Sequence, residues 1–343
     1  MKPSPHSLLG KLLAEASRIG HTTGLANAAA AIQKALGLGP DAKGPTSPTS
    51  PRPPAARAAP AVTPTAAAFD AGSFDTEAGT RAYKLFVPAG FGGQRLPLIV
   101  MLHGCTQDPD DFAAGTRMNA LAAAQGAIVL YPAQPPRSNA AKCWNWFQPA
   151  DQHRGGGEPA LLAAMTADVI ATHPVDPDRV YAAGLSAGGA MAAILGREYP
   201  DLFAAIGVHS GLPAGAADNV MAAFAAMQKG ASSPDPAPPR TPTIVFHGDS
   251  DATVHPANGD LLVAALNTSA STPTITEAAG RQVTHRSFRD SNGAIRAEHW
   301  LIHGAGHAWS GGCASGSFSD ETGPDASREM LRFFLAHPRS SVL

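Results

Sequence analysis

Residues 184–188 read Gly-Leu-Ser-Ala-Gly, a G-x-S-x-G sequence that places a serine between two glycines. So short a pattern also arises by chance, and its neighbours decide what it means. An apolar run at 180–183 precedes it and a run of mostly small residues at 189–195 follows it, which is typical of a strand that turns abruptly into a helix. Flanking side chains would clash in such a strained turn, hence the glycines. The pattern predicts that Ser186 is a nucleophile.

Two later loops carry carboxylates and imidazoles. An expected strand at 243–246 leads into His-Gly-Asp-Ser-Asp at 247–251, and a second at 299–302 leads into His-Gly-Ala-Gly-His at 303–307. Open α/β sheets build their sites at the carboxyl ends of strands, where both loops would lie. The chain order serine, aspartate, histidine is that of the α/β-hydrolases, in which the histidine acts as base and the aspartate as its partner.

Each of these loops offers two candidates. Asp251 lies two residues beyond Asp249 and has more reach toward an imidazole, whereas Asp249 is placed to bond the backbone of its own turn. His307 follows glycines that give its loop conformational freedom, whereas His303 ends a strand and is expected in the core. We therefore predict a catalytic triad of Ser186, Asp251 and His307.

A tetrahedral intermediate would also need hydrogen-bond donors for its oxyanion. The apolar run at 98–102 leads into a His-Gly pair that begins at His103, the place from which such enzymes supply one donor. We predict that the backbone N–H groups of Cys105 and Ala187 form the oxyanion hole. His103 and His247 are expected to have structural roles.

The chain has three cysteines, enough for one disulfide and one free thiol. A bridge between Cys105 and Cys143 would stabilise the fold by about 4 kcal/mol in the chain-entropy model, and two reduced thiols are an equal alternative. Neither the cysteines nor the histidines have the spacing of a metal site, so no metal and no cofactor are predicted.

Three of the four tryptophans, Trp144, Trp146 and Trp309, lie in segments that are expected to approach this site. Together they would form an apolar platform that binds an acyl chain, a polymer or an aromatic acid. Packing in the core is the alternative for each of them.

Strands alternate with helices after residue 66, which predicts one α/β domain at 67–338 with a mostly parallel central sheet flanked by helices. The expected strands are 81–87, 96–102, 128–131, 180–185, 204–209, 243–247 and 299–303. The expected helices are 110–125, 159–173, 188–199, 217–229, 259–266 and 325–337.

The segment before this domain has a different character. Apolar residues recur with helical spacing within 1–38, and 39–66 is rich in proline and alanine, which predicts a helical segment followed by a disordered linker. We favour helices that pack on the domain or on a partner subunit, over helices that anchor the chain to a hydrophobic granule or surface. Residues 339–343 are a short tail.

Composition excludes several classes of protein. Twenty-five Lys and Arg against 27 Asp and Glu give a net charge of −2, which does not favour nucleic acid or an anionic membrane as partner. The sequence contains no apolar run long enough to span a bilayer. Charges interrupt the N-terminal apolar run and no cleavage site is evident, so a secretory signal is not predicted and a cytoplasmic location is favoured.

The chain resembles the polyhydroxybutyrate (PHB) depolymerase family of esterases, a branch of the α/β-hydrolases that also contains feruloyl and acetylxylan esterases. The resemblance lies in HGCTQDPDDFAAGTRMNALA (103–122), CWNWF (143–147), RVYAAGLSAGGAM (179–191), HGDSDATVHP (247–256), GAGHAWSGG (304–312) and GPDASREMLRFFLAH (323–337). It implies the α/β-hydrolase fold, the same three catalytic residues and, since the family is often secreted, an extracellular location.

The expected function is that of a serine esterase that forms an acyl-enzyme on poly(3-hydroxybutyrate) or related short hydroxyacyl esters. Feruloyl or acetylxylan esterase activity on plant-wall polysaccharide is the first alternative. A granule- or surface-binding protein with an incidental hydrolase domain is the second.

Overall fold

The computed structural model describes residues 66–76, 79–232, 241–264, 266 and 268–339. The expected helical segment at 1–38, nearly all of the expected linker and residues 340–343 lie outside these ranges. Among the described helices, none is long and apolar enough to cross a bilayer.

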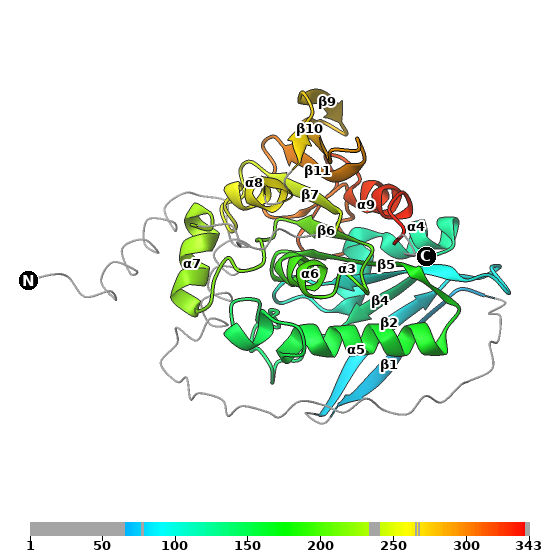
Figure 1. Ribbon diagram of the computed structural model, residues 1–343. Helices are drawn as coiled ribbons and strands as arrows, with labels where there is room; N and C mark the ends of the chain where they lie inside the picture. The colour runs from blue at the N-terminus through cyan, green and yellow to red at the C-terminus, as the bar shows by residue number, and fades with distance from the viewer. Residues whose placement is uncertain (1–65, 77–78, 233–240, 265, 267, 340–343) are drawn as a thin grey trace, which may run out of the picture.

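One large twisted sheet organises the described residues, with strands in the order β1-β2-β4-β3-β5-β6-β7-β11-β10-β8, and β9 pairs with β10 beside this path (Figure 1). The six strands from β4 to β11 in this order run parallel, and antiparallel strands extend both edges. The strands of this sheet are β1 Ala68–Thr76, β2 Gly79–Val87, β3 Leu96–Leu102, β4 Ile128–Pro132, β5 Val175–Leu185, β6 Ala205–His209, β7 Thr243–Gly248, β8 Ser269–Ala270, β9 Thr274–Ala278, β10 Arg281–Arg289 and β11 Ile295–Ile302.

Helices cover both faces of the sheet, and each face has its own apolar core. One core contains residues of α5 (Gly157–Thr172), α6 (Ala187–Glu198), α7 (Val220–Lys229) and α8 (Ala257–Ala264). The other contains residues of α3 (Pro109–Thr116), α4 (Met118–Gln125) and α9 (Ala326–Leu335). A short 3₁₀ helix, η1 (Pro149–Asp151), and a small pair of strands, β12 (Trp309–Ser310) and β13 (Ser319–Asp320), complete the elements.

Strand β3 shows why the central strands read as continuous apolar runs. All seven of its residues are buried; Leu98, Val100 and Leu102 face one core while Ile99 and Met101 face the other. A parallel strand covered by helices on both sides has no face in water, so its sequence does not alternate with polar residues.

The α/β-hydrolase architecture predicted from the sequence is confirmed, with local differences. The single helix expected at 110–125 is two helices, because Arg117 adopts a left-handed conformation with φ of 53° between α3 and α4. Strands β1 and β8 to β10 were not expected. They are antiparallel additions to the edges of the sheet, and the exposed residues of β9 form no apolar run from which a strand could be predicted.

Candidate active site

Ser186 lies at the junction between β5 and α6, as the G-x-S-x-G pattern predicts. Its backbone has φ of 57° and ψ of −120°, a conformation that L-residues rarely adopt. A Cβ on Gly184 would lie 2.4 Å from the carbonyl oxygen of Gly188, and one on Gly188 would lie 2.0 Å from that of Leu102. Both glycines are therefore required for the close approach of helix α6 to strands β3 and β5.

The two loops with candidate acids and bases are adjacent because β7 and β11 are parallel neighbours, with Gly248 opposite Ile302. The Ser250 amide donates to Ala305 O at 3.1 Å and ties the loops together beyond the strand ends. This arrangement places His307 Nδ1 2.7 Å from Asp251 Oδ2. The Asp251 side chain is fully buried and that of His307 is 6% exposed.

Asp251 is held as an ionised carboxylate. Its Oδ1 accepts hydrogen bonds from the backbone amides of Thr253 and Val254, both at 2.9 Å. Burial alone would raise the pKa of Asp251, but the interaction with His307 and hydrogen bonds from His247 and His307 outweigh it and keep the pKa far below its ordinary value. A permanently charged partner suits a histidine that must become an imidazolium during a reaction.

The competing pair, Asp249 and His303, lies beside this one and nearer to solvent. Asp249 Oδ2 lies 2.8 Å from His303 Nδ1, and Asp249 Oδ1 accepts from the Gly304 amide at 2.7 Å. Asp249 thus bonds the backbone of the neighbouring loop. The expectation that His303 lies in the core is wrong: its side chain is 32% exposed, because β11 ends at Ile302 and the imidazole pairs with Asp249 at the surface.

His247 packs behind Asp251 and is completely buried. Its Nε2 lies 2.8 Å from Val254 O and 3.5 Å from Asp251 Oδ2. The imidazole therefore fixes the loop that carries the acid, in line with its expected structural role.

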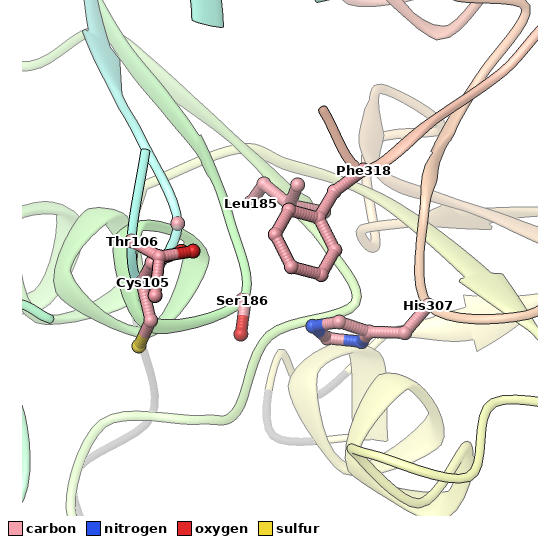
Figure 2. Close-up of a pocket in the computed structure, with 7 residues that line it drawn as sticks. Cys105, Thr106, Leu185, Ser186, His307 and Phe318 are labelled. Atoms are coloured by element: carbon pink, nitrogen blue, oxygen red, sulfur yellow. The ribbon is translucent and has the colours of Figure 1, made fainter. Parts of the chain in front are cut away.

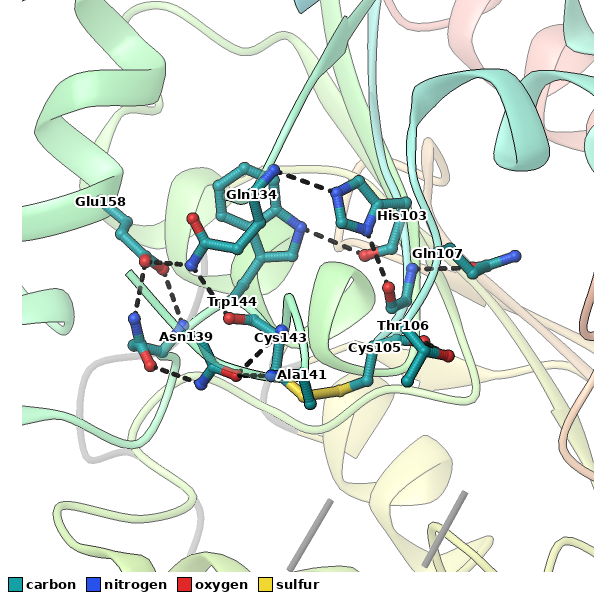
Figure 3. The surroundings of a disulfide bond; sticks show 12 residues. His103, Cys105, Thr106, Gln107, Gln134, Asn139, Ala141, Cys143, Trp144 and Glu158 are labelled. Atoms are coloured by element: carbon teal, nitrogen blue, oxygen red, sulfur yellow. Dashed lines mark hydrogen bonds between the residues drawn. A yellow bond between two sulfur atoms is a disulfide. The ribbon is translucent and has the colours of Figure 1, made fainter. Parts of the chain in front are cut away.

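The predicted oxyanion donors are the backbone N–H groups of Ala187 and of Cys105, which lines the same pocket as Ser186. Ala187 is the first residue of α6, so its N–H has no acceptor within the helix. The peptide between Gly104 and Cys105 is fixed by His103, whose Nδ1 lies 2.7 Å from Gly104 O (Figure 3). Because a trans peptide directs its N–H away from its C=O, the Cys105 N–H faces away from the His103 ring.

The protonation state of His103 is consistent with a hydrogen bond from its Nδ1 to Gly104 O. Burial lowers the pKa of His103 to about 4, so the imidazole is neutral near pH 7. Its Nε2 accepts from the Gln134 amide at 3.1 Å, which leaves the proton on Nδ1 to be donated to Gly104 O. His103 therefore holds the peptide that carries the Cys105 N–H, in line with the structural role predicted for it.

Cys105 and Cys143 form a disulfide, one of the two states that the sequence left open. The bridge joins the loop after β3, which contains Cys105, to the segment that contains Trp144 and Asn145. Buried Glu158 holds this segment, since its carboxylate accepts from the backbone and the side chain of Asn145, both at 2.7 Å. Burial raises the pKa of Glu158, and the hydrogen bonds from Asn145 partly offset that effect.

A small pocket that is open to solvent contains the candidate nucleophile and base (Figure 2). Its lining consists of Gly104, Cys105, Thr106, Leu185, Ser186, His307 and Phe318. Within the described residues, Ser186 Oγ makes no hydrogen bond with His307, although both line the pocket. Catalytic hydrogen bonds are often long without substrate and shorten when it binds.

None of the three tryptophans lines this pocket, and the predicted platform is wrong. Trp144, Trp146 and Trp309 are 0%, 4% and 1% exposed, respectively, because they pack in the two cores. The aromatic side chain that does line the pocket is Phe318, whose ring lies edge-on to the His307 imidazole with 6.5 Å between centroids. Phe318 lies in a loop outside the G-x-S-x-G and aspartate motifs and carried no sequence signal.

The described residues contain no group of three or more His, Cys, Asp or Glu side chains arranged as a metal site. The arrangement is a serine on a strained turn after β5, with a buried histidine–aspartate pair on the loops after β7 and β11. Fold and site together define an α/β-hydrolase.

Comparison with known proteins gives the family. The sequence pattern of the family described as "Esterase PHB depolymerase" matches residues 81–284, and the chain belongs to this family. Poly(3-hydroxyalkanoate) depolymerase C of Paucimonas lemoignei is 33% identical over 251 residues, which cover 68% of this chain and 60% of that protein. Feruloyl esterase B of Neurospora crassa is 37% identical over 116 residues, 34% of this chain and 39% of that protein.

The chain thus spans about half the length of the curated relatives it matches. Among solved structures, the acetyl xylan esterase of Aspergillus awamori superposes with a TM-score of 0.61 at 21% identity, over 77% of this chain and 98% of that one. This likeness supports the fold.

Proposed function

We propose that this chain is a serine esterase that hydrolyses carboxylic esters through an acyl-enzyme, with poly(3-hydroxybutyrate) or related short hydroxyacyl esters as substrates. The observation that carries the proposal is the convergence of Ser186, His307 and Cys105 on one pocket. A nucleophile, a base and an oxyanion donor are the three elements that acyl transfer needs.

In the proposed reaction, His307 Nε2 accepts the proton of Ser186 as Oγ attacks the ester carbonyl carbon. The N–H groups of Cys105 and Ala187 bind the resulting oxyanion, and Asp251 stabilises the imidazolium. The C–O bond to the alcohol then breaks, and the leaving oxygen takes the proton from His307. Water next attacks the acyl-enzyme with His307 as base, which releases the acid and regenerates Ser186.

The substrate class rests on the relatives and on the pocket. The two depolymerase relatives match 68% and 63% of this chain, against 34% for the feruloyl esterase. The pocket is small and its side chains include Leu185 and Phe318, which suits a short acyl group with apolar carbon atoms. Feruloyl and acetylxylan esters remain the second candidate, because relatives named as feruloyl and acetylxylan esterases match 34% and 47% of this chain.

A comparison of substrates tests both candidates. Purified protein is given amorphous poly(3-hydroxybutyrate), methyl ferulate and acetylated xylan in parallel, with Ser186→Ala as the control. We expect soluble hydroxybutyrate oligomers from the polyester and none from the variant. Release of product from methyl ferulate or acetylated xylan alone would show that the protein acts as a plant-wall esterase. Equal turnover by Ser186→Ala and the wild type would contradict the serine mechanism.

Binding to a hydrophobic granule or surface through residues 1–38 is a separate proposal, made from the sequence alone. A chain that lacks residues 1–66 tests it. If these residues serve only in attachment, the truncated protein keeps its turnover of a soluble p-nitrophenyl ester and loses co-sedimentation with polyester granules.

A further inference from the structure

Gln107 is 2% exposed and lies between two segments that line the pocket. The first wall is the loop of residues 103–106 after β3, called the oxyanion loop below, and the second wall is the loop that contains Phe318. The Gln107 side chain forms hydrogen bonds to both walls. Nothing in the proposed reaction uses its amide. A buried side-chain amide with all of its polar atoms engaged fixes the orientation of the groups it touches.

On the first wall, Gln107 Oε1 accepts the backbone N–H of Gly104 at 2.9 Å. The next peptide carries the Cys105 N–H, and His103 holds the carbonyl of that peptide at 2.7 Å. Gln107 and His103 therefore fix both peptides that flank the Gly104 Cα. Since an oxyanion donor must be aligned with the transition state, the direction of the Cys105 N–H depends on both contacts.

On the second wall, Gln107 Nε2 donates to Ser317 O at 2.9 Å and to Asp111 Oδ2 at 3.0 Å. Asp111 Oδ1 in turn accepts the Ser317 backbone N–H at 2.8 Å. Ser317 is thus held by its amide and its carbonyl immediately before Phe318, whose φ of 51° is unfavourable for a residue with a side chain. These contacts hold Phe318 in the conformation that lines the pocket.

The second wall also packs against α3 with little free space. A Cβ on Gly316 would lie 2.4 Å from Gly115 Cα, and the Cys313 amide donates to Gly115 O at 2.8 Å. The loop therefore follows α3, the helix that also contains Asp111. Through Gln107, the oxyanion loop, α3 and the Phe318 loop are joined by hydrogen bonds.

We propose that Gln107 is a positioning residue that couples the oxyanion hole to the aromatic wall of the pocket. Its carbonyl oxygen sets the Cys105 N–H, and its amide nitrogen sets Phe318 through Ser317. This inference rests on the proposed esterase function, in which the Cys105 N–H stabilises the transition state and Phe318 contacts the substrate.

Two variants separate the two ends of the side chain. Gln107→Met has a similar volume and removes both contacts. Gln107→Glu keeps an acceptor for the Gly104 N–H but sets a carboxylate oxygen against Asp111 and Ser317 O. Gln125→Met, at an exposed position on α4, is the matched control. All are assayed as the full chain with p-nitrophenyl butyrate, and thermal melting reports on the fold.

For Gln107→Met we expect kcat to fall by about 10- to 100-fold, less than the loss of a whole oxyanion donor. For Gln107→Glu we expect KM to rise at least about fivefold with a smaller change in kcat, because the second wall moves while the first is retained. Gln125→Met should match the wild type. A purely structural role would lower the melting temperature without this division between kcat and KM.

A folded Gln107→Met protein with kcat within about twofold of the wild type would overturn the proposal. If that variant does not fold, Asp111→Ala tests the second wall, and an unchanged KM there overturns the coupling to Phe318. The proposed function is tested separately in the same assay, since it fails if wild type and Ser186→Ala are equally active, whatever the Gln107 variants do.

Discussion

Replacement of Asp251 by asparagine should abolish most of the activity without unfolding the protein. The backbone amides of Thr253 and Val254 both donate to Asp251 Oδ1 at 2.9 Å, so an asparagine would keep its oxygen there and direct its NH₂ toward His307. That NH₂ needs an acceptor, which forces His307 to carry its proton on Nε2. An imidazole in this tautomer cannot accept the proton of Ser186.

The expected loss in kcat is about 10⁴-fold, the size seen when a triad histidine is locked in the wrong tautomer, or roughly 5 kcal/mol of transition-state stabilisation. The assay is steady-state hydrolysis of p-nitrophenyl butyrate, with circular dichroism and thermal melting to establish that the variant is folded. KM should change little, because Asp251 is fully buried and does not line the pocket.

The chain supplies its own matched control. Asp249→Asn makes the same substitution two residues earlier, in a carboxylate that pairs with His303 at the surface. We expect this variant to keep kcat within about threefold of the wild type, because a hydrogen-bonded pair at the surface contributes little. Equal losses in the two variants, or a folded Asp251→Asn protein with more than a tenth of wild-type kcat, would refute the assignment of the acid.

Three further predictions concern stability and substrate binding. Cys143→Ser should lower the free energy of unfolding in urea by about 4 kcal/mol through loss of the disulfide, whereas Cys313→Ser, at the free thiol, should not. Burial and the charge of Glu158 raise the pKa of Asp151 from 3.8 to about 7, so the folded protein retains a proton that the unfolded chain has lost, and the contribution of Asp151 to stability should fall as pH rises from 4 to 7. Urea titrations at pH 5 and pH 8 should therefore show a less negative change in the free energy of unfolding for Asp151→Asn than for the wild type; equal changes in the two proteins would contradict this role of Asp151. Trp309→Ala should lower the free energy of unfolding by about 3 to 5 kcal/mol with KM unchanged, because Trp309 is buried in the core. Phe318→Ala should raise KM with little loss of stability, because Phe318 lines the pocket. The reverse pattern would indicate that Trp309, and not Phe318, contacts the substrate.

The sequence predicted the parts of the site whose chemistry demands a particular residue type. A strained turn needs glycines at 184 and 188, and a parallel sheet brings its strand ends together, so Ser186, Asp251 and His307 could be placed by pattern and chain order. The break between α3 and α4 could not, because left-handed backbone at an arginine follows from packing rather than from local preference.

The aromatic lining was mispredicted for a related reason. Trp144 and Trp146 were predicted because their segment was expected to approach the site, but the largest apolar side chains bring the most stability when buried, and both are in the core. Phe318 reaches the pocket from a loop that hydrogen bonds hold against α3. Such a contact depends on residues about 200 positions apart, such as Gln107 and Ser317, and no local pattern encodes it.

The shape of the pocket divides the recognition of substrate into two parts. Seven of the described residues line a pocket that is open to solvent, and these residues would present the same surface to a small ester and to a polymer unit. A polyester chain continues beyond the unit that reacts with the nucleophile, so a preference for a polymer over a small ester would come from surface outside these lining residues. The effect of Phe318→Ala on p-nitrophenyl butyrate therefore measures the contribution of the pocket alone. Any further difference between polymer and small ester, in the same variant, measures the contribution of the surrounding surface.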